Sequence, residues 1–252
     1  MWSGSARGPA KGPRNGTPLR KKPDLVAPGY GLFTTGYLGG VTTGSDEPYA
    51  AVGTSLAAPV VSGLAALLWD TPDLGAPAIA EDDKPLAIRA VLINSAEDRG
   101  APGWDPDWGW GYVDAARAYA ERGGVAIGEI AAAGARRLYL RSSASATKAT
   151  LVWNRPVTFT STPPLKNLDL RLYALTSGQL RASSASTVDN VEQVASATAE
   201  GVVLAVEGND TFGAGDATAY ALAHGGGFVP AQPPQLAATL IAPGQVGAGA
   251  LF

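Results

Sequence analysis

Hydrophobic residues recur at helical spacing in the first half of the chain, between loops rich in proline and glycine. This spacing predicts three helices. The first covers residues 55–68. The second has Asp83 as its N-cap and Pro85 in its first turn, and continues through LAIRAVLINSA. The third is DAARAYAER, with Asp114 at its head and Gly123 just past its end.

The second half carries short runs of strand length, rich in β-branched and alternating apolar residues. Its predicted strands are residues 135–142, 148–154, 168–175, 179–184, 201–208 and 217–224. The turn at 176–178 predicts a hairpin between the third and fourth of these. So many short strands within about a hundred residues favour an antiparallel sandwich or barrel.

The helical pattern of the first half gives way to the strand pattern of the second half near Gly123 and Gly124, where we place a domain boundary. We expect one domain over residues 1–122 and a second domain, an all-β antiparallel sandwich or barrel, over residues 124–225. Residues 226–252 are rich in glycine, proline and alanine and read as a tail.

Composition narrows the possible functions of the 252-residue chain. A hydrophobic content of 46% supports a sizeable core, while a net charge of −3 with one short basic run, residues 20–22, argues against nucleic-acid binding. Cysteine is absent, which excludes disulfides and thiolate metal sites. The uncharged run 48–69 contains polar residues and proline, so it predicts a buried helix and no membrane span. No signal-peptide pattern opens the chain.

The sequence GTSLAAP places Ser55 at the start of the first predicted helix. Unpaired N–H groups and the positive end of the helix dipole stabilise negative charge there, so the backbone N–H of Ser55 could contribute to an oxyanion hole. Gly53 allows a tight turn into the helix. Pro59 cannot donate a hydrogen bond to the carbonyl of Ser55. The alternative is that Ser55 only caps the helix.

Four motifs, in order, resemble the C-terminal third of the catalytic domain of a subtilase, a subtilisin-like serine protease. They are KKPDLVAPG, GTSLAAP, VLINSAED and GAPGWDPDWGWGYVDAARA, and the resemblance covers residues 2–122. It implies that residues 1–122 form part of an α/β domain with a parallel sheet, and that Ser55 is the acylating nucleophile. Residues 22–24 and 27–29 would be scaffold, with no catalytic role for Asp24. The aromatic residues of the last motif would plug the base of this domain; the alternative is that they form a platform for a carbohydrate or a peptide.

The family's catalytic Asp and His precede the serine in sequence. Only 54 residues precede Ser55 and none is His, while the single histidine, His224, falls at the end of a predicted strand. The family's oxyanion Asn also falls in the region that is not represented. We therefore interpret the chain as a protease fragment that is inactive by itself. We expect its first half to be marginally stable or aggregation-prone unless an N-terminal fragment completes it. The alternatives are a non-catalytic binding or adhesion module, or one half of a split protease.

Residues 124–225 resemble the C-terminal β-sandwich of some secreted alkaline subtilases, with landmarks at 167–170 and 189–192. The resemblance implies an extracellular protein that acts on protein or peptide substrates, and makes calcium a possible cofactor. The candidate calcium ligands are scattered carboxylates, for which solvated side chains are the simpler interpretation: Asp169, Asp189, Glu192, Asp210 and Asp216. We assign no metal ligand.

Overall fold

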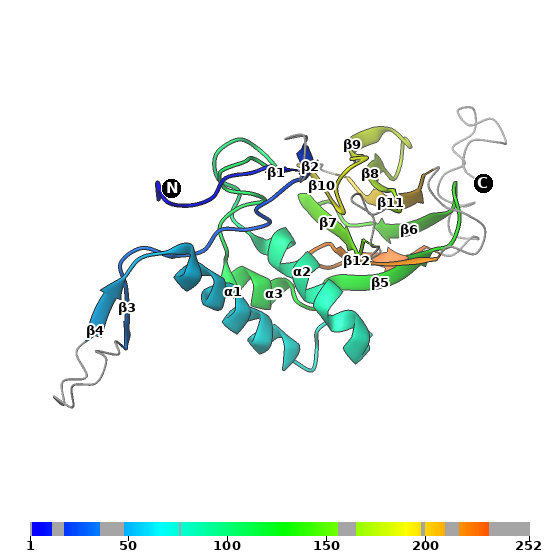
Figure 1. The fold of residues 1–252 in the computed structure, drawn as a ribbon. Helices are drawn as coiled ribbons and strands as arrows, with labels where there is room; N and C mark the ends of the chain where they lie inside the picture. The colour runs from blue at the N-terminus through cyan, green and yellow to red at the C-terminus, as the bar shows by residue number, and fades with distance from the viewer. Residues whose placement is uncertain are drawn as a thin grey trace.

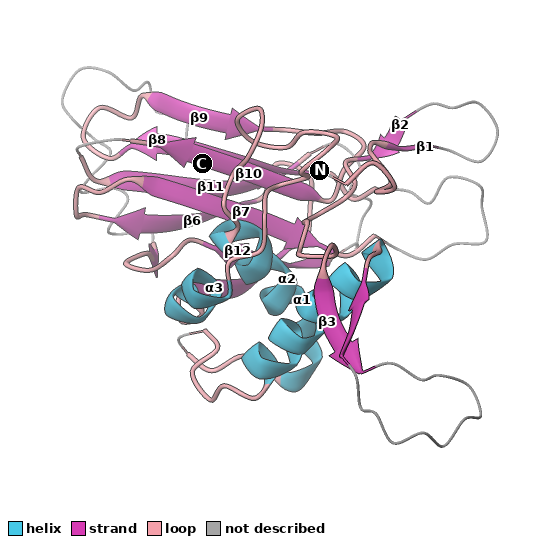
Figure 2. Ribbon diagram, turned by 90° about the vertical axis from the view of Figure 1, so that its left-hand side faces the viewer, coloured by secondary structure: helices cyan, strands magenta, loops and turns pink. Residues whose placement is uncertain are grey.

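The computed structural model describes residues 2–11, 18–35, 48–75, 77–155, 165–197, 200–209 and 217–231. Helices lie along one side of a stack of strands (Figure 1). A pair of short strands, β3 (Leu32–Thr35) and β4 (Pro48–Ala51), extends away from the body (Figures 1 and 2). None of the helices formed by these residues has the length and hydrophobicity of a membrane span.

The three predicted helices are present. They are α1 (Thr54–Trp69), α2 (Lys84–Ser95) and α3 (Ala115–Glu121), and a 3-10 turn, η1 (Glu81–Asp83), leads into α2. Asp114 caps α3, because its carboxylate accepts a hydrogen bond of 2.9 Å from the N–H of Arg117. Asp83 occupies the N-cap position of α2, but its side chain makes no capping hydrogen bond.

The second half forms two antiparallel sheets, so the prediction of an all-β C-terminal part is confirmed. The four-stranded sheet has the order β10, β7, β12, β5, with bounds Val191–Ser196, Thr147–Trp153, Thr218–Ala223 and Val125–Ile130. The five-stranded sheet has the order β13, β6, β11, β8, β9, with bounds Val229–Pro230, Arg136–Arg141, Val202–Gly208, Leu168–Ala174 and Leu180–Ser184.

All six predicted strands are present, and β8 and β9 form the expected hairpin. The predicted strands do not include β5 and β10. The predicted sandwich ends at residue 225, whereas β13 pairs with β6 and Phe228 is buried in the core. The sheet therefore continues into the segment that was assigned to the tail. Residues 232–252 lie outside the described part of the chain.

Two hydrophobic clusters share the four-stranded sheet, because successive side chains of a strand point to opposite faces. Leu151 and Trp153 of β7 belong to the cluster that this sheet shares with the five-stranded sheet. Val152, between them, belongs to the cluster built around the helices. Helix α2 lies against β7, β12 and β5. The cluster around the helices therefore takes residues from both halves of the chain, while the second cluster lies within the strand-rich half.

The described strands of the first half pair antiparallel. They are β1 (Ala10–Lys11) with β2 (Pro18–Arg20), and β3 (Leu32–Thr35) with β4 (Pro48–Ala51). The parallel sheet implied by the resemblance is represented, among the described residues, by one parallel bridge between Val26 and Tyr112. The α/β character of this half thus rests on its helices and on this single bridge.

Candidate active site

Ser55 is the second residue of α1, and its side chain is exposed to solvent. The first N–H groups of a helix have no partner within the helix. The N–H of Ser55 is one of these groups, beside a hydroxyl that makes no hydrogen bond to a described residue. This end of α1 therefore offers a free hydroxyl and a free amide at the positive end of a helix dipole.

The chain turns into α1 through Gly53, whose backbone angles are φ +156° and ψ +155°. Only glycine adopts this region readily. The N–H of Gly53 donates to the carbonyl of Gly29 at 2.7 Å. A Cβ on Gly29 would stand 2.7 Å from the carbonyl oxygen of Gly53, so this contact also requires glycine. The Ala27-Pro28-Gly29 motif thus holds the turn that presents Ser55.

A cavity of about 550 Å³ opens beside this turn. Gly53, Thr54 and Ala57 line it from the side of α1, and Tyr30 and Trp108 are among the residues that line it elsewhere. Pro59 is inside α1 and has no N–H, so the carbonyl of Ser55 lacks its usual partner four residues on. The carbonyl of Ser55, like its amide, is therefore left without a backbone partner within α1.

The Lys-Pro-Asp segment runs beside the glycine- and tryptophan-rich motif. The N–H of Trp110 donates to the carbonyl of Asp24 at 2.9 Å, and the N–H of Val26 donates to the carbonyl of Gly111 at 3.0 Å. A Cβ on Gly109 would meet the carbonyl oxygen of Pro23 at 2.4 Å. Backbone hydrogen bonds therefore hold two of the four sequence motifs side by side. Their close approach requires glycine at position 109.

Asp24 makes two ion pairs at the end of a second cavity. Its carboxylate lies 2.6 Å from Lys22 Nζ and 3.2 Å from Arg89 Nε. Burial would raise the pKa of Asp24, but the positive charges of Arg89 and Lys22 outweigh it and hold that pKa below its ordinary value. These contacts account for Asp24 as a link between its segment and α2, and they give it no reacting partner.

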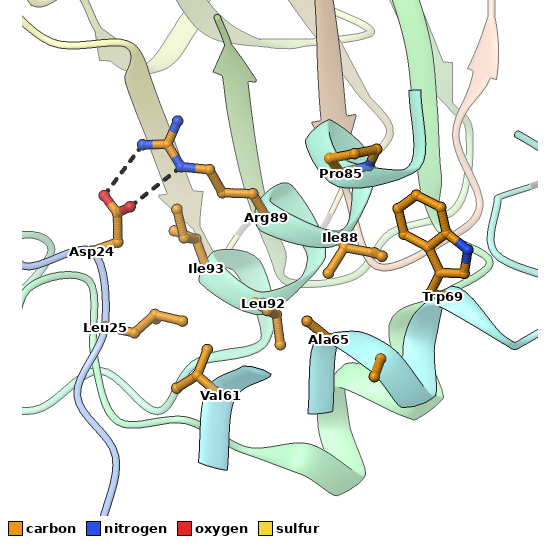
Figure 3. Close-up of a pocket in the computed structure, with 11 residues that line it drawn as sticks. Asp24, Leu25, Val61, Ala65, Trp69, Pro85, Ile88, Arg89, Leu92 and Ile93 are labelled. Atoms are coloured by element: carbon orange, nitrogen blue, oxygen red, sulfur yellow. Dashed lines mark hydrogen bonds and ion pairs between the residues drawn. The ribbon is translucent and has the colours of Figure 1, made fainter. Parts of the chain in front are cut away.

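This second cavity, of about 700 Å³, lies between α1 and α2 (Figure 3). Val61, Ala65 and Trp69 line it from α1, and Ile88 and Leu92 line it from α2. Apart from the Asp24–Arg89 pair, its surroundings in Figure 3 are apolar. Its lining is mainly apolar and offers few polar groups that could bind or react with a substrate.

The aromatic residues of the last motif pack inward. Trp110 is buried in the helical core, and Trp104 packs against that core while its Nε1–H donates to the carbonyl of Pro23 at 3.2 Å. The carboxylate of Asp105 accepts from the backbone N–H groups of Asp107 and Trp108, at 2.8 and 2.7 Å. Asp105 therefore organises a turn, and these aromatic residues form part of the core under the site.

His224 follows the last residue of β12 and is 8% exposed. Its Nδ1 accepts a hydrogen bond of 3.1 Å from the N–H of Gly226. Burial, together with the charge of Arg141, lowers the pKa of His224 to about 4. His224 lines a different cavity from the one beside Ser55, in a glycine-rich loop after the sheet. The structure thus places it at a strand end, as the sequence predicted, and buried.

The candidate calcium ligands do not form one group. Asp189 is fully buried, and neither of its carboxylate oxygens has a hydrogen-bond partner among the described residues. Glu192 accepts from the Ser184 hydroxyl and from the Ser186 N–H, and burial raises its pKa to about 7. Asp169 accepts from Asn209 and pairs with Arg171. The described residues contain no cluster of three metal-ligating side chains. Asp210 and Asp216 lie outside the described residues.

Comparison with known proteins supports the resemblance. Residues 3–111 match the family model described as the subtilase family. A protein named subtilisin-like protease SBT3.16, from Arabidopsis thaliana, is 37% identical over 91 residues, covering 36% of this chain and 10% of that protein. Subtilisin-like protease SBT3.6 from the same plant is 38% identical over 90 residues, covering 34% of this chain and 10% of its own length.

A bacterial protein is similarly close. The Neisserial autotransporter lipoprotein NalP, from Neisseria meningitidis serogroup B, is 39% identical over 72 residues, covering 29% of this chain and 6% of that protein. The matched part of the chain thus spans a tenth or less of the length of these relatives.

Proposed function

We propose, from the premise that residues 3–111 carry subtilase-family sequence, that this chain supplies the nucleophile-bearing part of a subtilisin-like serine endopeptidase. Ser55 is the acylating nucleophile in this proposal. The observation that carries it is the exposed hydroxyl of Ser55 at the open first turn of α1, held there by the Gly53–Gly29 contact.

In this proposal the chain contributes the nucleophile and one oxyanion donor to peptide hydrolysis. The Ser55 Oγ attacks the carbonyl carbon of the scissile peptide, and its proton passes to a base. The C–N bond then breaks, and the amine leaves with that proton. Water hydrolyses the resulting ester and restores the hydroxyl. Throughout, the N–H of Ser55 and the dipole of α1 stabilise the oxyanion.

A second polypeptide segment supplies the base, its carboxylate and the second oxyanion donor in this proposal. The uncovered surface of α1 supports such a neighbour. Cavities of about 700, 550 and 500 Å³ flank this helix on different sides. Val60, Leu67 and Trp69 are exposed, although each is large and apolar. An apolar surface of this kind is typical of an interface with another protein segment.

The relatives suggest a substrate class and a location for the proposed activity. Proteins and peptides are the substrate class that a subtilisin-like protease acts on. The neisserial relative is named an autotransporter lipoprotein. We place the activity outside the cytoplasm on that basis.

Labelling with a fluorophosphonate tests the proposal. Loss of the triad histidine in subtilisin lowers kcat about 10⁶-fold, so we expect no detectable labelling of the chain alone. We expect labelling once the chain is co-expressed with the preceding part of a subtilase catalytic domain, which carries Asp, His and the oxyanion Asn. That labelling should vanish in Ser55→Ala.

Ser62→Ala is the matched control, since Ser62 is exposed on the same helix and its hydroxyl only donates to the carbonyl of Ala58. Labelling that survives Ser55→Ala in the complemented protein would overturn the role of Ser55. Labelling of the chain alone that disappears in Ser55→Ala would show that the chain contains its own base.

A further inference from the structure

A small polar cavity lies where the helices meet the sheets. Its volume is about 250 Å³. Asn94 of α2, Glu121 of α3 and Lys148 of β7 line it, together with Arg141 at the end of β6 and the loop 224–227 after β12. These residues lie far apart in sequence, and the fold brings them to one place. Since drug-sized ligands occupy roughly 300–1,000 Å³, this cavity suits a smaller molecule.

The lining carries more positive than negative charge. Arg117, Arg141 and Lys148 face one carboxylate, Glu121. That carboxylate is already occupied, because it accepts from Arg117 Nε at 2.7 Å and from Asn94 Nδ2 at 2.9 Å. Arg141 and Lys148 therefore remain without a carboxylate partner among the described residues. Three cations thus face one carboxylate in the lining, and the charge of Asp98 outside it also acts on Lys148.

Arg141 is 5% exposed. Its Nη2 donates to the carbonyl of Ser145 at 2.7 Å and to the hydroxyl of Thr147, and its guanidinium lies 4.7 Å from the Phe228 ring centre. All of these partners are neutral, and Nε has no partner. A buried charge without a counter-ion costs free energy. An anion in the cavity would remove that cost.

Lys148 presents the second such charge. Its Nζ donates to the carbonyl of Ala96 at 2.8 Å, past the end of α2. Burial and the nearby charge of Arg117 lower its pKa to about 8, although Asp98 and Glu121 act in the opposite direction. An ammonium group has three donors, so two hydrogens remain for a ligand.

Neutral donors complete the cavity. His224 accepts at Nδ1, so a neutral ring carries its proton at Nε2 and can donate from there. Gly225, Gly226 and Gly227 have φ values of +68°, +113° and +77°. The N–H of Gly226 already donates to His224 Nδ1, so the N–H groups of Gly225 and Gly227 are the ones that remain for a ligand. Backbone N–H groups in a turn can form an anion-binding concavity. A Cβ on Gly227 would also stand 3.2 Å from the Cδ of Arg141, so the loop approaches this side chain closely.

We propose that this cavity binds a small multivalent oxyanion of the phosphate or sulfate type, held between Arg141 and Lys148 and by the 224–227 loop. A divalent anion matches the charge of the two unpaired cations, and a tetrahedral group can accept from several donors at once. The bound ion bridges β6, β7 and the loop after β12. This site is independent of Ser55, so its test does not depend on protease activity.

Titration with inorganic phosphate against chloride at matched ionic strength tests the proposal, with the backbone amide NMR signals of Gly225–Gly227 as the readout. We expect saturable shifts in these signals. Lys148→Gln keeps a donor for Ala96 but removes the charge, and should weaken binding roughly tenfold, the loss expected for one charge-assisted hydrogen bond. Arg141→Met should abolish it. Arg137→Gln is the control, since Arg137 is exposed on the same strand.

Shifts that do not saturate, or that Arg137→Gln reduces as much as Lys148→Gln does, would overturn the proposal. So would unchanged affinity in a folded Lys148→Gln protein, whatever the fate of Arg141→Met. A sulfate titration in parallel distinguishes a site for tetrahedral oxyanions in general from one that selects phosphate.

Discussion

Helices α1 and α2 pack against each other but are covered to very different extents (Figure 1). Helix α1 carries no charged residue over its 16 residues, yet only Leu64 and Leu68 are buried. Helix α2 begins with Lys84 and contains Arg89, yet nine of its 12 residues are buried. The amount of apolar surface in a helix therefore does not decide its burial. The neighbours do, since α2 lies between α1 and the four-stranded sheet.

This difference is informative because isolated apolar helices are rarely left open in soluble proteins. Helix α1 has the apolar composition of a helix in a protein core, but most of its residues are not buried. A helix of this kind is completed by another segment. The comparison between α1 and α2 therefore supports the proposal that a further part of a catalytic domain covers α1.

Truncation of one buried and one exposed leucine or isoleucine should separate the two helices most clearly. Ile93 of α2 is fully buried, and Leu67 of α1 is 70% exposed. Ile93→Ala should lower the free energy of unfolding by about 2–5 kcal/mol, since it removes buried methyl groups and leaves a cavity. Leu67→Ala should change it by less than about 0.5 kcal/mol. Urea denaturation followed by circular dichroism measures both, and equal losses would contradict the comparison.

Asn94 fastens α2 to the sheet and to α3. Its Nδ2 donates to Glu121 at 2.9 Å, and its Oδ1 accepts from the Thr150 hydroxyl at 3.0 Å. Asn94→Ala should cost about 1–3 kcal/mol of stability, because buried groups lose their partners. The exposed Asn154 provides the control, and Asn154→Ala should be nearly neutral. If denaturant titrations give both variants the same stability, the hydrogen bonds of Asn94 do not contribute to the free energy of unfolding.

The helices could be predicted from the sequence because helical spacing and capping act locally. The first three predicted ranges agree with α1, α2 and α3 to within about two residues. Strand β10 was missed because Glu192 interrupts its apolar pattern, although the structure buries that carboxylate fully. Strand β13 was missed because its two residues lie in a glycine- and proline-rich context, where pairing with β6 decides the conformation.

The candidate sites divide in the same way. The position of Ser55 at a helix start follows from GTSLAAP alone, since glycine and the helix start are neighbours in the chain. The cavity with Arg141 and Lys148 could not be predicted, because it joins residues from 94 to 227 through the packing of α2 on the sheet. A run of three glycines after a histidine was the one local signal for it.

The Asp24–Arg89 pair joins the segment before α1 to α2, and it should make stability depend on pH. The pKa of Asp24 is lower in the folded protein than in the unfolded chain. The stabilisation is therefore fully present above the unfolded pKa, near 4, and is lost as the pH falls through the lower, folded value. Asp24→Asn should cost about 1 kcal/mol at pH 7, because the pair is only partly buried.

Thermal unfolding between pH 2 and 7 measures this effect. The stability difference between the protein and Asp24→Asn should shrink toward acid pH. Asp70→Asn, at an exposed position just past α1, serves as the control and should follow the original protein. A difference that stays constant from pH 7 down to pH 2 would mean that the carboxylate charge of Asp24 makes no contribution.

A charge on the open face of α1 should have the smallest effect on stability and a clear effect on association. Leu67→Lys should change the free energy of unfolding by less than about 0.5 kcal/mol, since the position is solvated. It should nevertheless reduce concentration-dependent self-association of the chain in sedimentation experiments, because it interrupts the apolar surface formed with Val60 and Trp69.

The exposed Leu180 on β9 provides a matched control, and Leu180→Lys should leave self-association unchanged. In the complemented protease, the same Leu67→Lys change should weaken assembly with the preceding part of the catalytic domain. If α1 is covered there, a lysine must lose its hydration against an apolar neighbour. Assembly that tolerates Leu67→Lys would mean that the added part of the catalytic domain does not bind to the uncovered face of α1.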